Sequence, residues 1–217
     1  MTSRTEIFLE KYRTPLPDHL AEMSRYAADN NIPIISRGTG DILRYTLRTM
    51  LPDEILEIGT AIGFSALFMS DCLPDSDVHI TTIEKIGSRY ELAEENFSRY
   101  DTKKRITLIK EDAGDAIERL KNEGRRYKVI FLDAAKGQYV YFLPTLIDLL
   151  DTGGVLMTDN VFHGGVVLNS RYAVNQRDRT IHERLREFLT AVTENDRLES
   201  LIFPVDDGIV VSKKIKE

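Results

Sequence analysis

Short apolar segments alternate with helix-forming segments between residues 54 and 159, and this order constrains the fold more than any other feature. Strands are expected at Glu54–Ile58, Val78–Glu84, Arg105–Ile109, Lys128–Asp133 and Val155–Asp159. Helices are expected near Phe64–Cys72, Ser88–Arg99, Ala113–Asn122 and Tyr139–Leu150. Strands that alternate with helices form a parallel sheet through right-handed crossovers. The chain is therefore predicted to be an α/β protein with helices on both faces of the sheet.

The two ends of the chain do not follow this alternation of strands and helices. Helical spacing predicts N-terminal helices over Thr2–Tyr12, Asp18–Asn30 and Gly38–Met50, with Asp18 as an N-cap. A turn at 151–154 precedes the fifth strand, and a polar helix is expected over Arg179–Thr193. Leu198–Pro204, the turn Asp206-Asp207-Gly208 and Ile209–Lys213 then predict a hairpin, so a C-terminal strand should be antiparallel. We expect one domain over 1–217, with a helical cap (1–50) on an α/β core (51–217).

Composition narrows the functional classes. The 217 residues include 29 basic and 35 acidic side chains, for a net charge of −6, which argues against a strong general nucleic-acid binder but leaves a local basic patch open. The single cysteine, Cys72, is expected to be a buried small apolar group, and its isolation fits the reducing cytoplasm. Met1–Lys11 lacks the apolar region of a signal peptide, and no apolar run reaches membrane-spanning length, so no membrane association is expected.

Residues 55–65 read Ile-Leu-Glu-Ile-Gly-Thr-Ala-Ile-Gly-Phe-Ser, a strand followed by a glycine turn and a helix start. Gly59 permits a sharp turn, and Gly63 permits close approach of the next helix. A dinucleotide site usually carries G-x-G-x-x-G, because a pyrophosphate lies against bare backbone. The two-glycine spacing here suits a cofactor without a pyrophosphate, such as S-adenosylmethionine.

Glu84 closes the second strand, where an acid is placed to accept hydrogen bonds from two ribose hydroxyls. Glu57 would sense the ammonium group of the cofactor, and Ser65 or the helix N-terminus its carboxylate. The alternative is an ordinary strand–turn–helix unit of an α/β domain. The position of Glu84 behind the glycine motif favours the cofactor site.

Further acids follow the other strands of the sheet. Asp112-Ala113 follows the third strand, and Asp112 could accept a hydrogen bond from an adenine amino group. Asp133, Asp159 and Asn160 supply three oxygen donors at one edge of the sheet. Such a donor set favours Mg²⁺, with Mn²⁺ and Ca²⁺ as alternatives, and the lack of a histidine or cysteine cluster argues against zinc. For each of these residues alone, helix capping is the competing interpretation.

Lys136 lies three residues beyond Asp133 and is a candidate base. A nearby divalent cation disfavours its ammonium form, so that it could take a proton from a hydroxyl nucleophile. A solvated loop lysine is the alternative. His163 is a second candidate base, although a lone loop histidine is more often a polar surface residue.

Together these residues resemble the metal-dependent class I methyltransferases of the catechol and caffeoyl-CoA O-methyltransferase family. The matching stretches are 57–65, Ile83-Glu84, Asp112-Ala113, 133–139, 158–160 and 204–209. The resemblance implies a Rossmann-like fold with seven mostly parallel strands, S-adenosylmethionine as methyl donor, and a divalent metal held by Asp133, Asp159 and Asn160. It implies that Lys136, with Asp133, serves catalysis. The implied cofactor contacts are Glu57, Gly59, Thr60, Ala61, Gly63, Ser65, Glu84, Asp112, Ala113 and Asp133.

Within that family, the chain is most similar to bacterial tRNA 5-hydroxyuridine O-methyltransferases, which form 5-methoxyuridine at the wobble position. The similarity rests on 31–34, 133–139, 158–161 with Gly164, and 209–214. Two positions depart from the family pattern. Phe188-Leu189 stands where relatives often have an aromatic–Asn pair, and Asp206 replaces a glycine.

The metal site alone does not choose the acceptor, because catechol and 5-hydroxyuracil both offer two neighbouring oxygens. An arginine group over 171–186 suits an anticodon loop of tRNA, with solvated helix charge as the alternative. A small-molecule hydroxyl acceptor and a non-catalytic nucleotide-binding module remain the other interpretations. The N-terminal helices and the 161–178 loop are expected to exclude water from the site. The resemblance also implies a homodimer.

Overall fold

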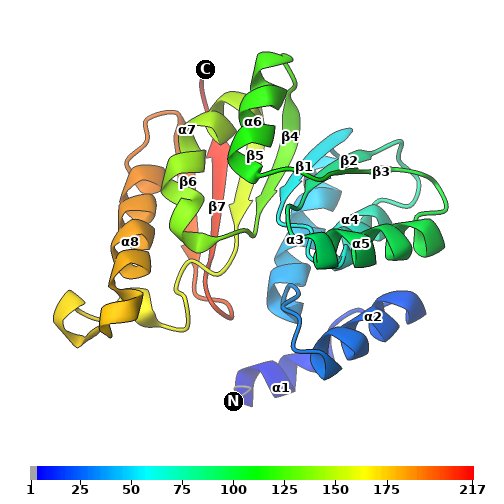
Figure 1. The fold of residues 1–217 in the computed structure, drawn as a ribbon, viewed down its shortest axis with the longest axis horizontal. Coiled ribbons are helices and arrows are strands. Elements are labelled where there is room, and N and C mark those ends of the chain that lie inside the picture. The colour runs from blue at the N-terminus through cyan, green and yellow to red at the C-terminus, as the bar shows by residue number, and fades with distance from the viewer. Residues whose placement is uncertain (1–3) are drawn as a thin grey trace.

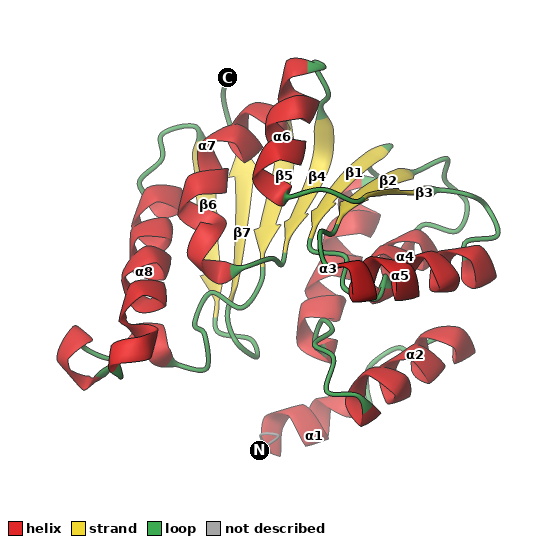
Figure 2. Ribbon diagram, viewed as in Figure 1, coloured by secondary structure: helices red, strands yellow, loops and turns green. Residues whose placement is uncertain are grey.

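The computed structural model describes residues 4–217 and forms a seven-stranded sheet in the order β3-β2-β1-β4-β5-β7-β6 (Figures 1 and 2). The strands are β1 (Glu54–Ile58), β2 (His79–Ile83), β3 (Ile106–Ile109), β4 (Tyr127–Leu132), β5 (Leu150–Thr158), β6 (Leu198–Phe203) and β7 (Ile209–Lys214). Pairings among the first five strands are parallel, whereas β7 runs antiparallel to both β5 and β6. The predicted fold class is confirmed.

Helices connect the strands in the order that the sequence predicts. They are α1 (Arg4–Glu10), α2 (Asp18–Asp29), α3 (Arg37–Met50), α4 (Phe64–Cys72), α5 (Gly87–Tyr100), α6 (Ala113–Asn122), α7 (Tyr139–Leu149) and α8 (Arg179–Thr193). Single 3₁₀ turns lie at η1 (Lys136–Gln138), η2 (Val166–Leu168), η3 (Arg171–Ala173) and η4 (Gln176–Asp178). Residues 2 and 3 of the first expected helix lie outside the described residues.

Two local predictions are wrong. Asp18 is the first helical residue of α2 instead of its N-cap, because the chain is extended at Pro17 and already helical at Asp18. Its charge still lies in the first turn, where the helix dipole favours an acid. The turn expected at 151–154 is absorbed into β5, whose pairing with β4 shifts register between Tyr127 and Val129. Gly153, at φ +84°, accommodates this irregularity.

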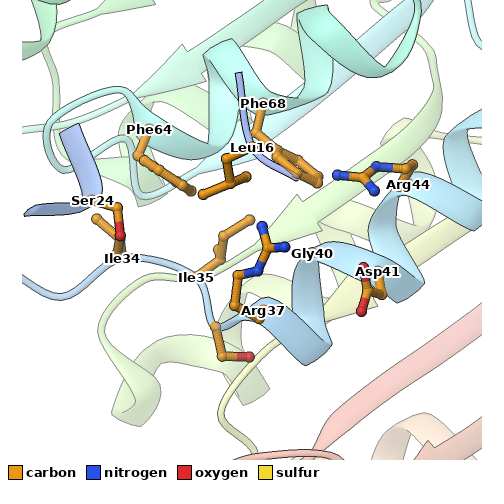
Figure 3. A pocket seen from close by; sticks show the side chains of 11 residues that line it. Leu16, Ser24, Ile34, Ile35, Arg37, Gly40, Asp41, Arg44, Phe64 and Phe68 are labelled. Atoms are coloured by element: carbon orange, nitrogen blue, oxygen red, sulfur yellow. The ribbon is translucent and has the colours of Figure 1, made fainter. Parts of the chain in front are cut away.

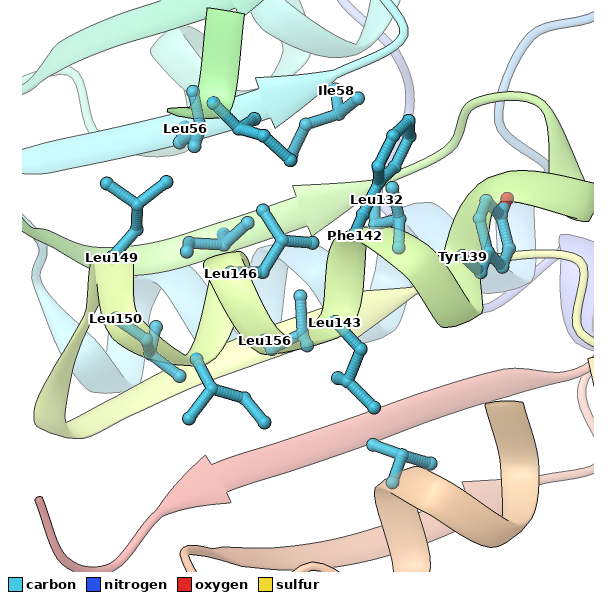
Figure 4. Close-up of a cluster of buried hydrophobic side chains, with 14 of the residues drawn as sticks. Leu56, Ile58, Leu132, Tyr139, Phe142, Leu143, Leu146, Leu149, Leu150 and Leu156 are labelled. Atoms are coloured by element: carbon cyan, nitrogen blue, oxygen red, sulfur yellow. The ribbon is translucent and has the colours of Figure 1, made fainter. Parts of the chain in front are cut away.

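The sheet is covered on both faces, and each face has its own core. One core joins α6, α7 and α8 to the sheet, and Figure 4 shows α7 residues such as Leu143 and Leu146 packed over Leu56, Leu132 and Leu156. The other core joins α2, α3 and α4 to the opposite face. The free thiol of Cys72 is buried in this second core, as predicted. The carboxyl ends of the strands are thereby held between two packed layers.

The two glycines of the 55–65 motif lie where a side chain would not fit. Gly59 has φ +106°, and a Cβ there would collide with the backbone carbonyl of Asp133. Gly63 has φ +82°, and its Cβ would lie 2.5 Å from the Phe97 ring of α5. The predicted need for glycine at both positions is confirmed, and at Gly59 it brings the ends of β1 and β4 together.

The C-terminal hairpin forms hydrogen bonds to the segment that follows β5. Its turn has Asp206 at φ +50° and Gly208 at φ +82°. Val161 N donates to Gly208 O at 3.1 Å, and Gly164 N donates to Asp207 Oδ1 at 2.6 Å. The hairpin therefore fixes the chain immediately beyond Asn160. In the part of the chain that the structure describes, no helix is long and apolar enough to cross a membrane.

Candidate active site

The loop after β1 surrounds a buried carboxylate, Glu57. Its Oε2 accepts a 2.5 Å hydrogen bond from the Thr82 hydroxyl, while its Oε1 is buried without a hydrogen-bond partner among residues 4–217. Burial raises the pKa of Glu57 to about 7, against the lowering effect of the Ser65 and Thr82 hydroxyls. An unsatisfied carboxylate oxygen at this depth is suited to an ammonium group, as the sequence predicts.

Glu84 lies beside the same loop at the end of β2 and is also buried. Its Oε2 accepts from Ala61 N at 3.1 Å, and its Oε1 accepts from the backbone N–H groups of Lys85 and Ile86, each at 3.0 Å. These bonds hold the carboxylate at the rim, and each oxygen has capacity for a further donor. The predicted ribose contact is compatible with this arrangement and stays a prediction.

Asp112 and Ala113 lie at the start of α6. Asp112 is the N-cap of α6, since its Oδ1 accepts from Gly114 N at 2.9 Å, and its Oδ2 pairs with Lys85 Nζ at 2.9 Å. The Lys85 ammonium and the Gly114 N–H lower the pKa of Asp112. The side chain thus performs the capping role that was the competing interpretation, and the adenine contact stays a prediction.

The carboxyl ends of β4 and β5 bring Asp133, Asp159 and Asn160 together, as predicted from the topology. Asp159 is almost fully buried. Its Oδ1 accepts from Thr39 Oγ1 at 3.1 Å and from Asn160 N at 2.8 Å. Burial and then the charge of Asp133 raise the pKa of Asp159 to about 7, and burial likewise raises the pKa of Asp133.

These residues fit a divalent cation by their chemistry. Asp159 Oδ2 is buried and, within the described chain, has no hydrogen-bond partner. The charge of Asp133 raises the pKa of Asp159, and Asp159 keeps one unsatisfied oxygen, so a nearby cation would stabilise this pair of carboxylates. No group of three or more His, Cys, Asp or Glu side chains is placed to bind a metal in residues 4–217. The predicted ligand set contains only two side chains of these four types, Asp133 and Asp159. Its third member is the amide of Asn160.

Lys136 begins the turn η1, directly after β4. Its Nζ donates to Asn160 Oδ1 at 3.1 Å, and its charge lowers the pKa of Asp133 and Asp159. The structure therefore places Lys136 within the acidic edge instead of in solvent. His163 lies in the loop beyond β5 at φ +48°, and no side-chain hydrogen bond links it to these residues.

Sequence reasoning missed three side chains that support the site. Thr39, on α3, donates to Asp159, and Thr82, on β2, donates to Glu57. The buried hydroxyl of Tyr139 donates to the backbone oxygen of Asp159 at 3.2 Å. Thr39 lies 120 positions from its partner, so no local pattern in the sequence could have revealed the contact.

The late arginines are engaged with the protein itself. Arg171 pairs with Glu183 at 2.8 Å, Arg184 donates to Gly137 O at 3.2 Å, and Arg186 donates to Asn169 O at 3.3 Å. The side chains of Arg171 and Arg177 are nevertheless 65% and 84% exposed.

The Phe188-Leu189 departure has a packing explanation. Phe188 is fully buried, and its ring meets Tyr139 edge-on at 5.6 Å between centroids. Leu189 packs against the same core as a partly buried side chain. Both residues therefore contribute to the α8 interface with the sheet.

A cavity of about 280 Å³ lies between α2, α3 and α4 (Figure 3). Its walls include Ile34, Phe64 and Phe68, and Arg44 lies over the Phe68 ring at 5.1 Å. It borders Ser36 at the start of α3, but none of the predicted metal ligands lines it. The cavity therefore adjoins the acidic edge without containing it.

Comparison with known proteins agrees with this geometry. A family model described as O-methyltransferase matches residues 11–215. Tapetum-specific methyltransferase 1 of Arabidopsis thaliana is 30% identical over 161 residues, which cover 74% of this chain and 69% of that protein. A caffeoyl-CoA O-methyltransferase of Stellaria longipes is 26% identical over 205 residues, covering 91% and 84%.

A solved structure supports the same assignment. The methyltransferase PaMTH1 of Podospora anserina, crystallised with S-adenosylhomocysteine (SAH), superposes with a TM-score of 0.85 at 28% identity, covering 99% of this chain and 94% of that one. With a family match across nearly its whole length, and with the buried acids at the strand ends described above, the chain belongs to the O-methyltransferase family.

Proposed function

We propose that this O-methyltransferase transfers the methyl group of S-adenosylmethionine to one of two neighbouring hydroxyl oxygens on a small aromatic acceptor, with the help of a divalent cation. The observation that carries the proposal is the buried Asp159 Oδ2, which has no hydrogen-bond partner in residues 4–217 and lies at the edge shared by Asp133 and Asn160. Asp133, Asp159 and Asn160 would hold the cation, which would supply a positive charge that stabilises the anion of an acceptor hydroxyl.

The methyl donor is assigned to the loop after β1. Glu57 Oε1 supplies an unsatisfied acceptor for an ammonium group, and Gly59 and Gly63 keep the loop free of Cβ atoms. The relative from P. anserina was crystallised with SAH, the demethylated product of this donor. Glu84, held by three backbone N–H groups, is assigned to the ribose hydroxyls.

The chain's own residues then prepare the acceptor. A divalent cation held by Asp133, Asp159 and Asn160 would favour the deprotonated form of the acceptor hydroxyl. Lys136, whose Nζ lies 3.1 Å from Asn160 Oδ1, is placed next to that hydroxyl and is the candidate group to receive its proton. The acceptor oxygen forms a bond to the methyl carbon as the carbon–sulfur bond breaks, and the sulfonium becomes a neutral thioether.

Two further observations favour a small acceptor. The cavity beside the first turn of α3 is large enough for a small molecule, and its walls combine aromatic and aliphatic side chains with polar and charged ones. Several curated relatives are named caffeoyl-CoA O-methyltransferases. The arginines Arg184 and Arg186, in contrast, donate to backbone carbonyls of this chain.

Methylation of 5-hydroxyuridine in a tRNA anticodon loop is the second candidate. The exposure of Arg171 and Arg177 close to the segment after β5 favours it, because phosphate contacts need accessible guanidinium groups. Its binding should weaken steeply with salt, whereas methylation of a neutral catechol should not.

The deciding experiment supplies radiolabelled S-adenosylmethionine and Mg²⁺ with, in turn, a catechol, caffeoyl-CoA, and tRNA that carries 5-hydroxyuridine. We expect label in a small acceptor, and we expect excess chelator or Asp159→Asn to abolish transfer. Full turnover in excess chelator would refute the cation-dependent reaction. Label found only in tRNA, and lost in Arg171→Gln/Arg177→Gln, would select the second candidate.

A further inference from the structure

The first turn of α3 connects Asp159 to the turn between β6 and β7. Thr39 lies at the centre of this connection because it donates twice. Its hydroxyl donates to Asp159 Oδ1 at 3.1 Å, and its backbone N–H donates to Ser36 Oγ at 3.0 Å. Ser36, the N-cap of α3, donates in turn to Asp206 Oδ2.

Side chains of the β6–β7 turn approach the first turn of α3 closely at Gly38. A Cβ on Gly38 would collide with Asp206 Oδ2 and would lie 2.5 Å from Val205 Cγ1. The β6–β7 turn therefore rests directly on the start of α3. Since that turn also accepts hydrogen bonds from Phe162 and Gly164, it holds both ends of the connection to Asp159.

The hydrogen bonds determine which oxygen of Asp159 is available. Thr39 and the Asn160 N–H both donate to Oδ1, while Oδ2 has no hydrogen-bond partner in the described chain. A carboxylate held by one oxygen presents the other in a fixed direction. Such supporting contacts orient metal ligands and tune their affinity.

We infer that Thr39 is a positioning residue for Asp159: its hydroxyl holds Oδ1 so that Oδ2 faces the cation, and the Ser36–Asp206 cap holds Thr39. This inference rests on the proposed function, because it concerns the cation assigned there. It adds that α3 and the β6–β7 turn, which supply no ligand, set the cation affinity. Asp206, a departure from the family pattern, is part of that support.

The test measures Mn²⁺ binding to the purified chain by titration calorimetry, without methyl donor or acceptor. Thr39→Val preserves the shape of the side chain and removes the hydroxyl, and we expect it to weaken Mn²⁺ binding by about 10-fold. Thr39→Ser keeps a hydroxyl and should restore most of the affinity. Thr46→Val is the matched control, since Thr46 is buried on the same helix two turns further from the site, and it should bind Mn²⁺ as the wild type does.

Kinetics provide a second readout. For Thr39→Val, the Mn²⁺ concentration that gives half-maximal activity should rise, while kcat at saturating Mn²⁺ changes little. If Asp159→Asn loses Mn²⁺ binding but Thr39→Val binds as tightly as the wild type, the inference is wrong and the proposed function stands. If the wild type binds no Mn²⁺, the proposed cation site is wrong and the inference falls with it.

Discussion

The glycine at the start of α4 gives a prediction whose magnitude follows from the structure. Gly63 has φ +82°, and a Cβ there would lie 2.5 Å from Phe97. Gly124 has φ +72°, and nothing lies within 4 Å of its Cβ position. Alanine at either position incurs a left-handed backbone penalty of about 1–2 kcal/mol, offset by about 0.4–1 kcal/mol through the unfolded chain. Only Gly63→Ala adds a steric penalty, of about 1–3 kcal/mol.

The expected loss in free energy of unfolding is therefore about 0–1.6 kcal/mol for Gly124→Ala, and about 1–3 kcal/mol more than this for Gly63→Ala. For a chain of this size each kcal/mol lowers Tm by about 2–4 °C, so the two variants separate clearly in thermal unfolding followed by circular dichroism. A double-mutant cycle with Phe97→Leu should return part of the Gly63→Ala loss, because it removes the ring atoms that crowd the site. Equal losses for both glycine variants, or no coupling to Phe97, would refute the reasoning.

Three further predictions concern charged side chains. The pKa of Glu57 is about 7 in the folded protein and near its ordinary lower value in the unfolded chain, so between about pH 4 and 7 the folded state keeps a proton that the unfolded state has lost. The free energy of unfolding therefore falls as pH rises from about 4 to 7. Glu57→Gln should reduce the fall in Tm between those pH values, and an unchanged slope would contradict the assignment. Lys136→Met should lower kcat by about 10²-fold or more without weakening Mn²⁺ binding, measured by single-turnover methylation and calorimetry, and full activity would exclude Lys136 as the base. Arg105→Met should lower the free energy of unfolding, measured in urea, by about 2–4 kcal/mol, because it leaves the carbonyls of Leu73 and Pro74 without the guanidinium donor. The exposed Lys103→Gln is the control and should leave the free energy of unfolding nearly unchanged. Equal losses in the two variants would contradict the prediction.

Much of the fold could be predicted because its determinants are local. The bounds of β1, α4, α6 and α8 match the expected ranges, since each follows from hydrophobic spacing within one segment. The turn expected at 151–154 failed for a tertiary reason: β4 pairs with β5 on both sides of it, and the strand assignment runs through the irregularity. The residues 151–154 themselves do not indicate that β4 and β5 pair on both sides of them.

The candidate site was predictable where topology alone brings residues together. Asp133, Asp159 and Asn160 end adjacent parallel strands, so their proximity follows from the strand order. The support from Thr39 depends on a contact between distant segments that the sequence does not encode locally, whereas the capping role of Asp112 is local and was the competing interpretation. Arg105 illustrates the same limit, because its guanidinium is buried among carbonyls of the loop after α4, which no local pattern in the sequence indicates.

The position of β7 between β5 and β6 has a consequence for how the chain acquires its structure. β6 is translated before β7 but has no partner in the sheet until β7 pairs with β5 along Val155–Thr158. During synthesis, the first five strands can assemble before the residues of the hairpin have left the ribosome. Because the hairpin turn also holds the segment after Asn160, the acidic edge should become ordered only once the hairpin has formed.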